Sequence, residues 1–133
     1  MRYDFNMAQQ NYKKFYQLDV WQEGFELMKE VYEISNKYPD EEKYALVSQS
    51  RRSANSVIAN TAEAHGRYHF KDKIRIYYIV RGEIEETQSH LWVAYSQKYI
   101  EKKRWLGLEK RYEKVKIRVN NQINDWHNQD KKK

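Results

Sequence analysis

The stretch SRRSANSVIANTAEAHGRY, residues 50–68, carries polar side chains of the kinds that bind ligands or take part in catalysis. Five of them are spaced four, four, three and four residues apart, so a helix would place them on one side. An apolar row lies beside this polar row, which predicts polar side chains half-buried against another helix or another chain. The polar row consists of Arg52, Ser56, Asn60, Glu63 and Arg67, and the apolar row of Ala54, Val57, Thr61 and Ala64.

Catalysis by the polar row would require a nucleophile paired with a base, and no sequence motif supplies that pair. The chain has no Cys, no Gly-rich phosphate-binding loop and no G-x-S-x-G motif. Ser and Thr residues occur, but none stands in a motif with a base. We therefore expect no enzymatic activity, no catalytic residue and no cofactor.

Two pairs of residues have a spacing that could bind a metal ion. His65 and His69 are four residues apart, but Gly66 should end the helix between them. Glu86 and His90 are also four apart, and the sequence holds no second copy of such a pair. Structural zinc needs three or four ligands, and di-metal bundle sites need Glu-x-x-His pairs on facing helices. We therefore expect no metal site.

The next helical segment offers partners for the polar row. A buried Arg or Glu needs an opposite charge, because breaking a buried pair costs roughly 3–5 kcal/mol. We predict that Glu63 pairs with Arg81, or that Arg52 pairs with Glu86. Gly82 should lie in mid-helix, where Gly costs about 1 kcal/mol relative to Ala, so we expect a close backbone approach there. These partners favour helix packing over ligand binding for the row, with its two arginines reaching a subunit interface or a phosphate.

Apolar residues at helical spacing predict four helices that position these groups. The first should begin at Asp19, a good N-cap, and run to about Lys37, where Tyr38-Pro39 stops it. The other three should run from Asp40 to about His65, from about Phe70 to Lys98, and from about Lys103 to Asn128. No strand-type alternation competes, so we expect an all-α fold, a four-helix bundle. The clearest core stripe lies in the fourth helix, at Leu108, Tyr112, Val115, Val119, Ile123 and Trp126.

The expected organisation is one domain with two short ends. Residues 1–17 lack a helical period and should form a flexible N-terminal arm, residues 18–128 the bundle, and residues 129–133 a basic C-terminal tail that frays. No run approaches the roughly 20 apolar residues of a membrane span, and the first residues lack a signal-peptide pattern. With no Cys to suggest an oxidising compartment, we expect a cytoplasmic protein.

The positive charge is concentrated in the last quarter of the chain. The net charge is +6, yet residues 1–97 hold 13 Lys and Arg against 14 Asp and Glu, while residues 98–133 hold 12 against 5. Such asymmetry is typical of proteins that bind phosphate-rich partners, although a solvated helix face would look the same. The candidate nucleic-acid-binding residues are Lys102, Lys103, Arg104, Lys110, Arg111, Lys114, Lys116 and Arg118, with the terminal lysines.

Aromatic residues are also numerous, with 12 Tyr and 4 Trp. Tyr beside Arg could stack on unpaired bases of a nucleic acid. Burial in a bundle core and contacts between subunits are the favoured interpretation, because Tyr and Trp are enriched in both places.

Several motifs together resemble one family of small bacterial four-helix-bundle proteins, encoded within intervening sequences of 23S ribosomal RNA genes. The motifs are LDVWQ at 18–22, YPDEEKYAL at 38–46, QSRRSANSVIANTAEA at 49–64, and an R-G-x-x-x-E pattern. The resemblance covers about residues 18–126. The chain departs from the family pattern at Ala64, Val80 and Glu83. The pattern maps onto Arg52, Ser56, Asn60, Glu63, Arg67, Arg81, Gly82 and Glu86 as a structural or interface set.

The resemblance implies an antiparallel up-down-up-down bundle that assembles as a ring-like homopentamer with a central channel or a basic surface. It also implies kinship with the accessory proteins of diversity-generating retroelements, which bind nucleic acid and a reverse transcriptase. We therefore expect a non-enzymatic oligomer that binds RNA or other nucleic acid. The alternative is a protein-interaction scaffold, such as an accessory subunit for a reverse transcriptase, without direct nucleic-acid readout.

Overall fold

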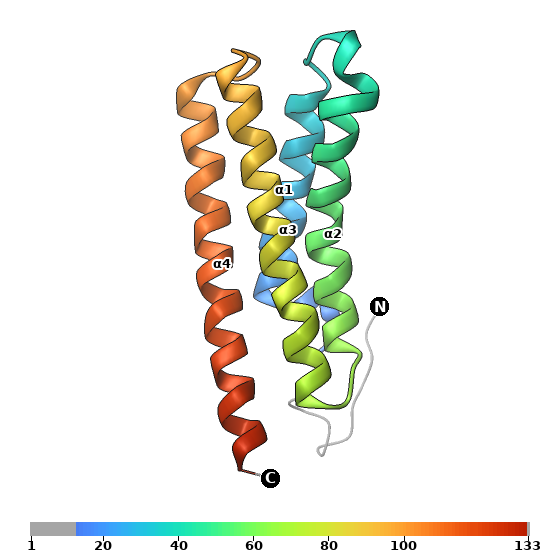
Figure 1. Cartoon of the computed structure of the whole chain (residues 1–133), viewed down its shortest axis with the longest axis vertical. Helices are drawn as coiled ribbons and strands as arrows, with labels where there is room; N and C mark the ends of the chain where they lie inside the picture. The colour runs from blue at the N-terminus through green and yellow to red at the C-terminus, as the bar shows by residue number, and fades with distance from the viewer. Residues whose placement is uncertain (1–12, 133) are drawn as a thin grey trace.

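Four long helices make up almost all of the computed structural model, which describes residues 13–132 (Figure 1). They are α1 (Asp19–Ser35), α2 (Ser48–His65), α3 (Phe70–Ser96) and α4 (Lys102–Lys131). Those residues contain no β-strand, so the expected all-α fold is confirmed. Residues 1–12 of the expected N-terminal arm lie outside the described residues, as does Lys133. A short 3₁₀ helix, η2 (Phe15–Gln17), precedes α1.

Side-chain contacts show that α1 and α2 run antiparallel, and so do α2 and α3. Arg51 at the start of α2 reaches Ser35 at the end of α1, with 2.9 Å between Nε and Oγ. Ser53 near the start of α2 meets Thr87 in the second half of α3, with 2.8 Å between their hydroxyl oxygens. In Figure 1 the α1–α2 and α3–α4 connections share one end of the bundle, and the α2–α3 connection lies at the other.

Arg51 closes the C-terminal end of α1, a role that the sequence analysis missed. Its Nη2 donates to the Tyr32 carbonyl oxygen at 3.3 Å and to Asn36 Oδ1 at 2.7 Å. The last carbonyls of a helix lack partners and carry partial negative charge, so a guanidinium satisfies both needs. The helix therefore ends at Ser35, earlier than the expected Lys37.

The segment predicted to start the second helix is helical but not α-helical. Residues Asp40–Glu42 form a 3₁₀ turn and Lys43–Val47 form a π-helical turn, so regular α-helix starts only at Ser48. Glu42 is held by the Tyr99 hydroxyl, which donates to its carboxylate at 2.8 Å, and Glu42 itself accepts from the Leu46 backbone N–H. Asp40 is thus not the N-cap of α2, because the chain first winds around this anchored carboxylate.

Helix α2 ends at His65 and α3 begins at Phe70, as predicted, and the remaining helix ends differ from expectation by one to three residues. Leu18 is the N-cap of α1, and Asp19 lies in the first turn, where its charge still favours the helix dipole. Helix α3 ends at Ser96, before the expected Lys98, which has a left-handed backbone with φ of 67°. Helix α4 continues to Lys131, so residues 129–131 of the expected tail are helical.

The core follows the predicted apolar rows. Leu108, Tyr112, Val115, Val119 and Ile123 of α4 are buried, and Trp126 packs against the core while partly exposed. The row of small residues on α2 is wholly buried, and Thr61 satisfies its hydroxyl by donating to the Val57 carbonyl oxygen at 2.7 Å. Small side chains on α2 allow the backbone of α3 to approach closely, as ridge-into-groove packing requires. That row comprises Ala54, Val57, Thr61 and Ala64.

A close approach of helices occurs at Gly24 of α1 and not at Gly82 of α3, which corrects the expectation. A Cβ atom on Gly24 would lie 2.9 Å from Ile58 Cγ2, so the absence of a side chain lets α2 pack here. A Cβ atom on Gly82 would meet nothing within 4 Å, because this position faces outward. Gly82 therefore has no compensating contact within the described bundle.

Replacing Gly24 by Ala should destabilise the protein, although Ala is the better helix former. The new methyl group must displace a stiff, β-branched side chain, and overpacking of this kind costs about 1–3 kcal/mol. The matched control is Gly107→Ala on α4, where a Cβ atom meets nothing within 4 Å. Urea denaturation should show a lower free energy of unfolding for Gly24→Ala and a gain of up to about 1 kcal/mol for Gly107→Ala. A gain at both positions would contradict the close approach.

Candidate nucleic-acid interface

The polar row of α2 makes one of its two predicted interhelical pairs. Arg52 forms an ion pair with Glu86 of α3 and lies 3.5 Å from a carboxylate oxygen of Glu83. Glu86 also lies 3.2 Å from His90 Nε2, one turn further along α3. The prediction that Arg52 pairs with Glu86 is confirmed. Arg52 therefore contributes to the α2–α3 contact, where its charge is largely neutralised.

The alternative pair, Glu63 with Arg81, does not form. Glu63 of α2 pairs at 2.5 Å with Arg67, which follows the end of α2, while Arg81 reaches across to α4 and donates to Asn120 Oδ1 at 2.9 Å. The helix register explains this outcome. Lys73 Nζ lies 3.0 Å from the Ala64 carbonyl oxygen, so Glu63 is level with the start of α3, about two turns from Arg81.

The middle of the polar row is satisfied within its own helix. Asn60 Nδ2 donates to both the carbonyl oxygen and the hydroxyl of Ser56, at 2.9 Å each. In the described part of the chain, the contacts of these two side chains are with each other and with the backbone of α2. The row is therefore a set of packing contacts and local ion pairs.

The three candidate arginines of α4 all face acidic residues of α1. Arg104, Arg111 and Arg118 are spaced seven residues apart, which places them on one side of the helix. Arg104 lies 2.9 Å from Glu33, and Arg111 lies 2.9 Å from Glu23. We call this set the arginine seam; its carboxylates are Asp19, Glu23, Glu30 and Glu33, and Glu30 contacts both Arg104 and Arg111.

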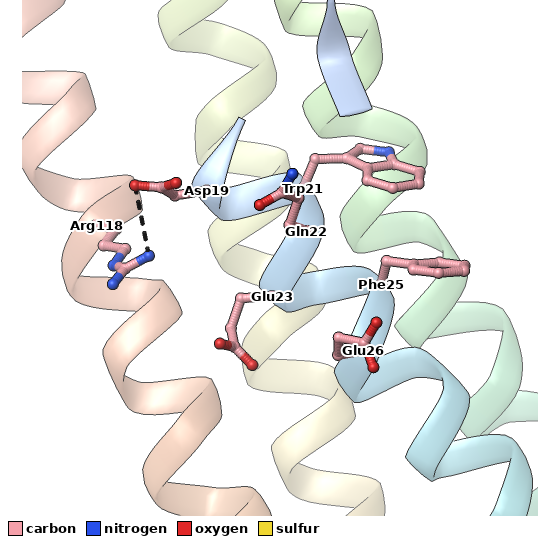
Figure 2. Close-up of a pocket in the computed structure, with 7 residues that line it drawn as sticks. All are labelled: Asp19, Trp21, Gln22, Glu23, Phe25, Glu26 and Arg118. Atoms are coloured by element: carbon pink, nitrogen blue, oxygen red, sulfur yellow. Dashed lines mark ion pairs between the residues drawn. The ribbon is translucent and has the colours of Figure 1, made fainter. Parts of the chain in front are cut away.

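Figure 2 shows the far end of the arginine seam, where an open pocket lies between α1 and α4. Arg118 reaches toward Asp19, with 3.9 Å between the closest charged atoms, and Glu23 lies on the same side of α1. Trp21 and Phe25 stack on the opposite side with their ring centroids 5.1 Å apart. Carboxylates outnumber the single guanidinium around this pocket, so it does not suit a phosphate.

Lys116 is also held by carboxylates, in this case on α3 and on its own helix. Its Nζ contacts Glu85 and lies 2.7 Å from Glu113. The hydrogen bonds from Lys116 and Gln88 lower the pKa of Glu113, and burial, together with the Glu113 charge, raises the pKa of neighbouring Glu109. Lys116 is thus part of a polar network between α3 and α4, and only a small part of its side chain is exposed.

The remaining four candidate residues form a different kind of surface. Their side chains are exposed, and within residues 13–132 no carboxylate forms an ion pair with them. We call them the free lysines of α4. The basic character of α4 alone does not distinguish these lysines from the arginines of the seam. The acidic residues of α1, at a spacing that matches the arginines, were the sequence signal that the arginines would be paired. The free lysines are Lys102, Lys103, Lys110 and Lys114.

No metal centre is present among residues 13–132, where no three acidic or histidine side chains gather in a metal-binding arrangement. His65 Nε2 instead donates to the Lys13 carbonyl oxygen at 2.5 Å, and His69 is exposed at the N-cap of α3. None of the helices in this part of the chain has the length and apolar character needed to cross a lipid bilayer.

Comparison with known families identifies the chain. The family model described as 23S rRNA-intervening sequence protein matches residues 16–121, a span that includes the polar row, all of α3 and the whole arginine seam. The chain belongs to this family. As a 23S rRNA-intervening sequence protein, it agrees with the resemblance drawn from its motifs.

A solved structure shares the fold of this intervening-sequence protein. It is the crystal structure of a protein of unknown function from the S23 ribosomal protein family of Bacteroides thetaiotaomicron. The two chains are 21% identical with a TM-score of 0.73, and the alignment covers 79% of this chain and 95% of the other. At this identity the likeness supports the fold. A search of curated proteins gives no match.

The Arg52–Glu86 pair of the intervening-sequence protein should make its stability depend on pH. The hydrogen bond from Arg52 lowers the pKa of Glu86 against the opposing effect of burial. A carboxyl with a depressed pKa contributes stability above its ordinary pKa of about 4.3, and this contribution is lost as the pH falls through the folded-state pKa. Arg52→Gln should therefore raise the Glu86 pKa, measured by carbon NMR titration.

The stability difference between the wild type and Arg52→Gln should be largest near neutral pH and should shrink below a pH of about 4.3. It should not exceed about 1 kcal/mol, because the pair is partly exposed. Arg67→Gln is the matched control, since its partner Glu63 lies only four residues away in the chain and the substitution should leave the Glu86 titration unchanged. Identical Glu86 titrations in the wild type and Arg52→Gln would exclude the pair.

Proposed function

We propose that this protein is a cytoplasmic, non-enzymatic, homo-oligomeric up-down-up-down bundle that binds RNA through the free lysines of α4. The observation that supports RNA binding is the division of the basic residues of α4 into two sets. Arginines and Lys116 are neutralised by carboxylates of α1 and α3, whereas Lys102, Lys103, Lys110 and Lys114 are exposed without an ion pair in the described residues.

The geometry of the free lysines suits a phosphate backbone. Lys103, Lys110 and Lys114 are seven and four residues apart, so they line one side of a straight helix over about 16 Å. Lysine heads on flexible stems act as point charges that neutralise phosphates and release counterions. They carry no base-specific geometry, so the expected binding follows RNA shape and charge more than sequence.

Removing two of these lysines should weaken RNA binding and reduce its dependence on salt. Each phosphate contact contributes roughly 0.7–0.9 to the magnitude of the log–log slope of affinity against salt concentration. The slope of the Lys110→Gln, Lys114→Gln double variant should therefore be smaller in magnitude by about 1.4–1.8. The measurement is fluorescence anisotropy with a labelled structured RNA over a salt series. Lys116→Gln is the matched control. Lys116 is paired with Glu85 and Glu113, so its substitution should leave the slope unchanged.

An absence of binding at low salt, or a slope that the double variant does not change, would contradict this function. An effect of Lys116→Gln as large as that of the double variant would contradict the division of α4 into two sets.

The outer face of α3 supports the homo-oligomer. Tyr78, Ile79 and Val93 are 44%, 42% and 39% exposed. Helical spacing places Tyr78 and Ile79 one turn from the outward-facing Gly82, and Val93 about three turns further along the same face. Large apolar side chains around a glycine give a second copy room for close contact, and exposed apolar patches of this kind mark interaction sites. The pentamer itself comes from the family resemblance, and a ring requires a contact that closes by rotation.

Native mass spectrometry of the purified protein should give the mass of five copies. Ile79→Lys should dissociate the assembly without unfolding the bundle, because this side chain is half-exposed in the single chain. Ile117→Lys on α4, at a side chain that is 55% exposed, is the matched control and should leave five copies intact. A wild-type monomer would contradict the oligomer, and an intact Ile79→Lys assembly would contradict the proposed face.

The second candidate function is a protein-interaction scaffold, such as an accessory subunit for a reverse transcriptase. It is favoured by Trp92, which is 52% exposed on a cluster with Tyr95 and Trp105, where Tyr95 and Trp105 stack with ring centroids 4.8 Å apart. Exposed Trp residues are typical anchors of protein interfaces. A protein that binds no RNA at low salt would leave this scaffold as the remaining candidate.

A further inference from the structure

Three separate segments meet at the end of the bundle that contains the α2–α3 connection. Lys73 near the start of α3 donates to the His65 carbonyl oxygen at 3.2 Å, and its Nζ lies 5.7 Å from the ring centre of Trp126 on α4. His65 in turn donates to the Lys13 carbonyl oxygen. Figure 1 shows the C-terminal end of α4 beside this connection, whereas the other two connections lie at the far end.

The antiparallel register brings further cations to this end. Tyr77 packs on Trp126, with ring centroids 4.6 Å apart, so the residues after Trp126 lie level with the first turns of α3. Lys131 and Lys132 therefore come to the same level as Lys71. The exposed cations gathered here from α2, α3, α4 and the start of the described chain are Lys13, Arg67, Lys71, Arg75, Lys131 and Lys132.

The local charge at this end is positive. Within residues 13–132, these cations together with half-buried Lys73 and Lys14 outnumber the carboxylates at this end, which are Glu63, Asp72, Asp125 and Asp130. Glu63 is paired with Arg67, and Asp125 accepts from Gln129. The opposite end of the bundle carries a smaller excess of positive charge, since seven cations of the described residues lie there with five carboxylates. Those residues are Lys37, Lys43, Arg51, Lys98, Lys102, Lys103 and Arg104 with Glu33, Asp40, Glu41, Glu42 and Glu101.

Tyr68 gives this basic end an aromatic surface. It lies in the α2–α3 connection between Arg67 and His69, and its side chain is 80% exposed although it makes an edge-on contact with the His69 ring. A tyrosine ring surrounded by cations is the arrangement on which unpaired bases stack while neighbouring cations hold the phosphates. A base in a duplex is already stacked and paired, so it cannot use this ring.

We infer that this end of the bundle binds single-stranded RNA, with Tyr68 stacking on an unpaired base and Lys71, Arg75, Lys131 and Lys132 contacting the flanking phosphates. The inference rests on the proposed function in that the protein binds RNA, but it concerns a different surface and a different form of RNA. The free lysines of α4 act on the backbone alone and accept a duplex. The two surfaces together would hold an RNA in which a helix adjoins an unpaired segment.

The test compares two probes on the full chain: a labelled oligouridine of about 12 nucleotides and an RNA duplex of similar length. Tyr68→Ala should weaken oligouridine binding about tenfold or more and leave duplex binding within about twofold, because only the single strand stacks. Tyr68→Phe should retain oligouridine affinity, since it keeps the ring. Tyr44→Ala is the matched control, as this tyrosine is 86% exposed at the opposite end beside Lys43.

The outcomes separate this inference from the proposed function. Duplex binding that the Lys110→Gln, Lys114→Gln variant weakens, with oligouridine binding unaffected by Tyr68→Ala, would overturn the inference and leave the proposed function standing. Equal losses for Tyr68→Ala and Tyr44→Ala would also overturn it. Binding to vesicles of anionic phosphatidylserine, with no binding to either RNA, would overturn both.

Discussion

The arginine seam between α1 and α4 is the interaction on which the rest of the structure depends. These helices are the first and last of the bundle, so no short connection holds them together. Guanidinium groups at seven-residue spacing meet carboxylates on the antiparallel helix, and Arg111 joins two of them, Glu23 and Glu30. Single exposed pairs contribute little to stability, but a network of planar, multiply bonded pairs fixes the register of two helices more firmly. The same contacts neutralise three basic residues of α4, which are therefore poorly suited to bind phosphates.

The ion pairs of the arginine seam determine which cations of α4 stay unpaired. The free lysines of α4 are exposed and take no part in the ion pairs of the seam, and the cations around Tyr68 gather where several segments end. Lysine and arginine thus have separate roles in this chain: most of the arginines make fixed contacts within the bundle, and most of the exposed charge comes from lysines. The polar row shows the same division, because Arg52 pairs with Glu86 of α3 and Arg67 pairs with Glu63 of α2. A basic net charge therefore overstates the surface open to nucleic acid.

Periodicity within one helix was predictable from the sequence, and pairing between helices was predictable only in part. The buried row of α4 and the small residues of α2 are direct consequences of helical spacing. The Arg52–Glu86 pair was found and the Glu63–Arg81 pair was not, because the choice depends on a register that loop geometry sets. The π-helical turn before Ser48 depends on the Tyr99 contact with Glu42, 57 residues apart, and no local signal reveals it. Gly24 and Gly82 look alike in sequence, yet only the first faces a neighbouring helix.

The division of basic residues can be measured directly by mass spectrometry of lysine acylation on the native protein, with and without bound RNA. We predict that Lys110 and Lys114 react rapidly in the free protein, because they are exposed. With RNA they should react several-fold more slowly, because the proposed function places them against phosphates. Lys116, only 15% exposed and held by Glu85 and Glu113, should react slowly in both states. Unchanged rates at Lys110 and Lys114 on adding RNA, or rapid reaction of Lys116 in the free protein, would contradict the separation of structural and RNA-binding cations.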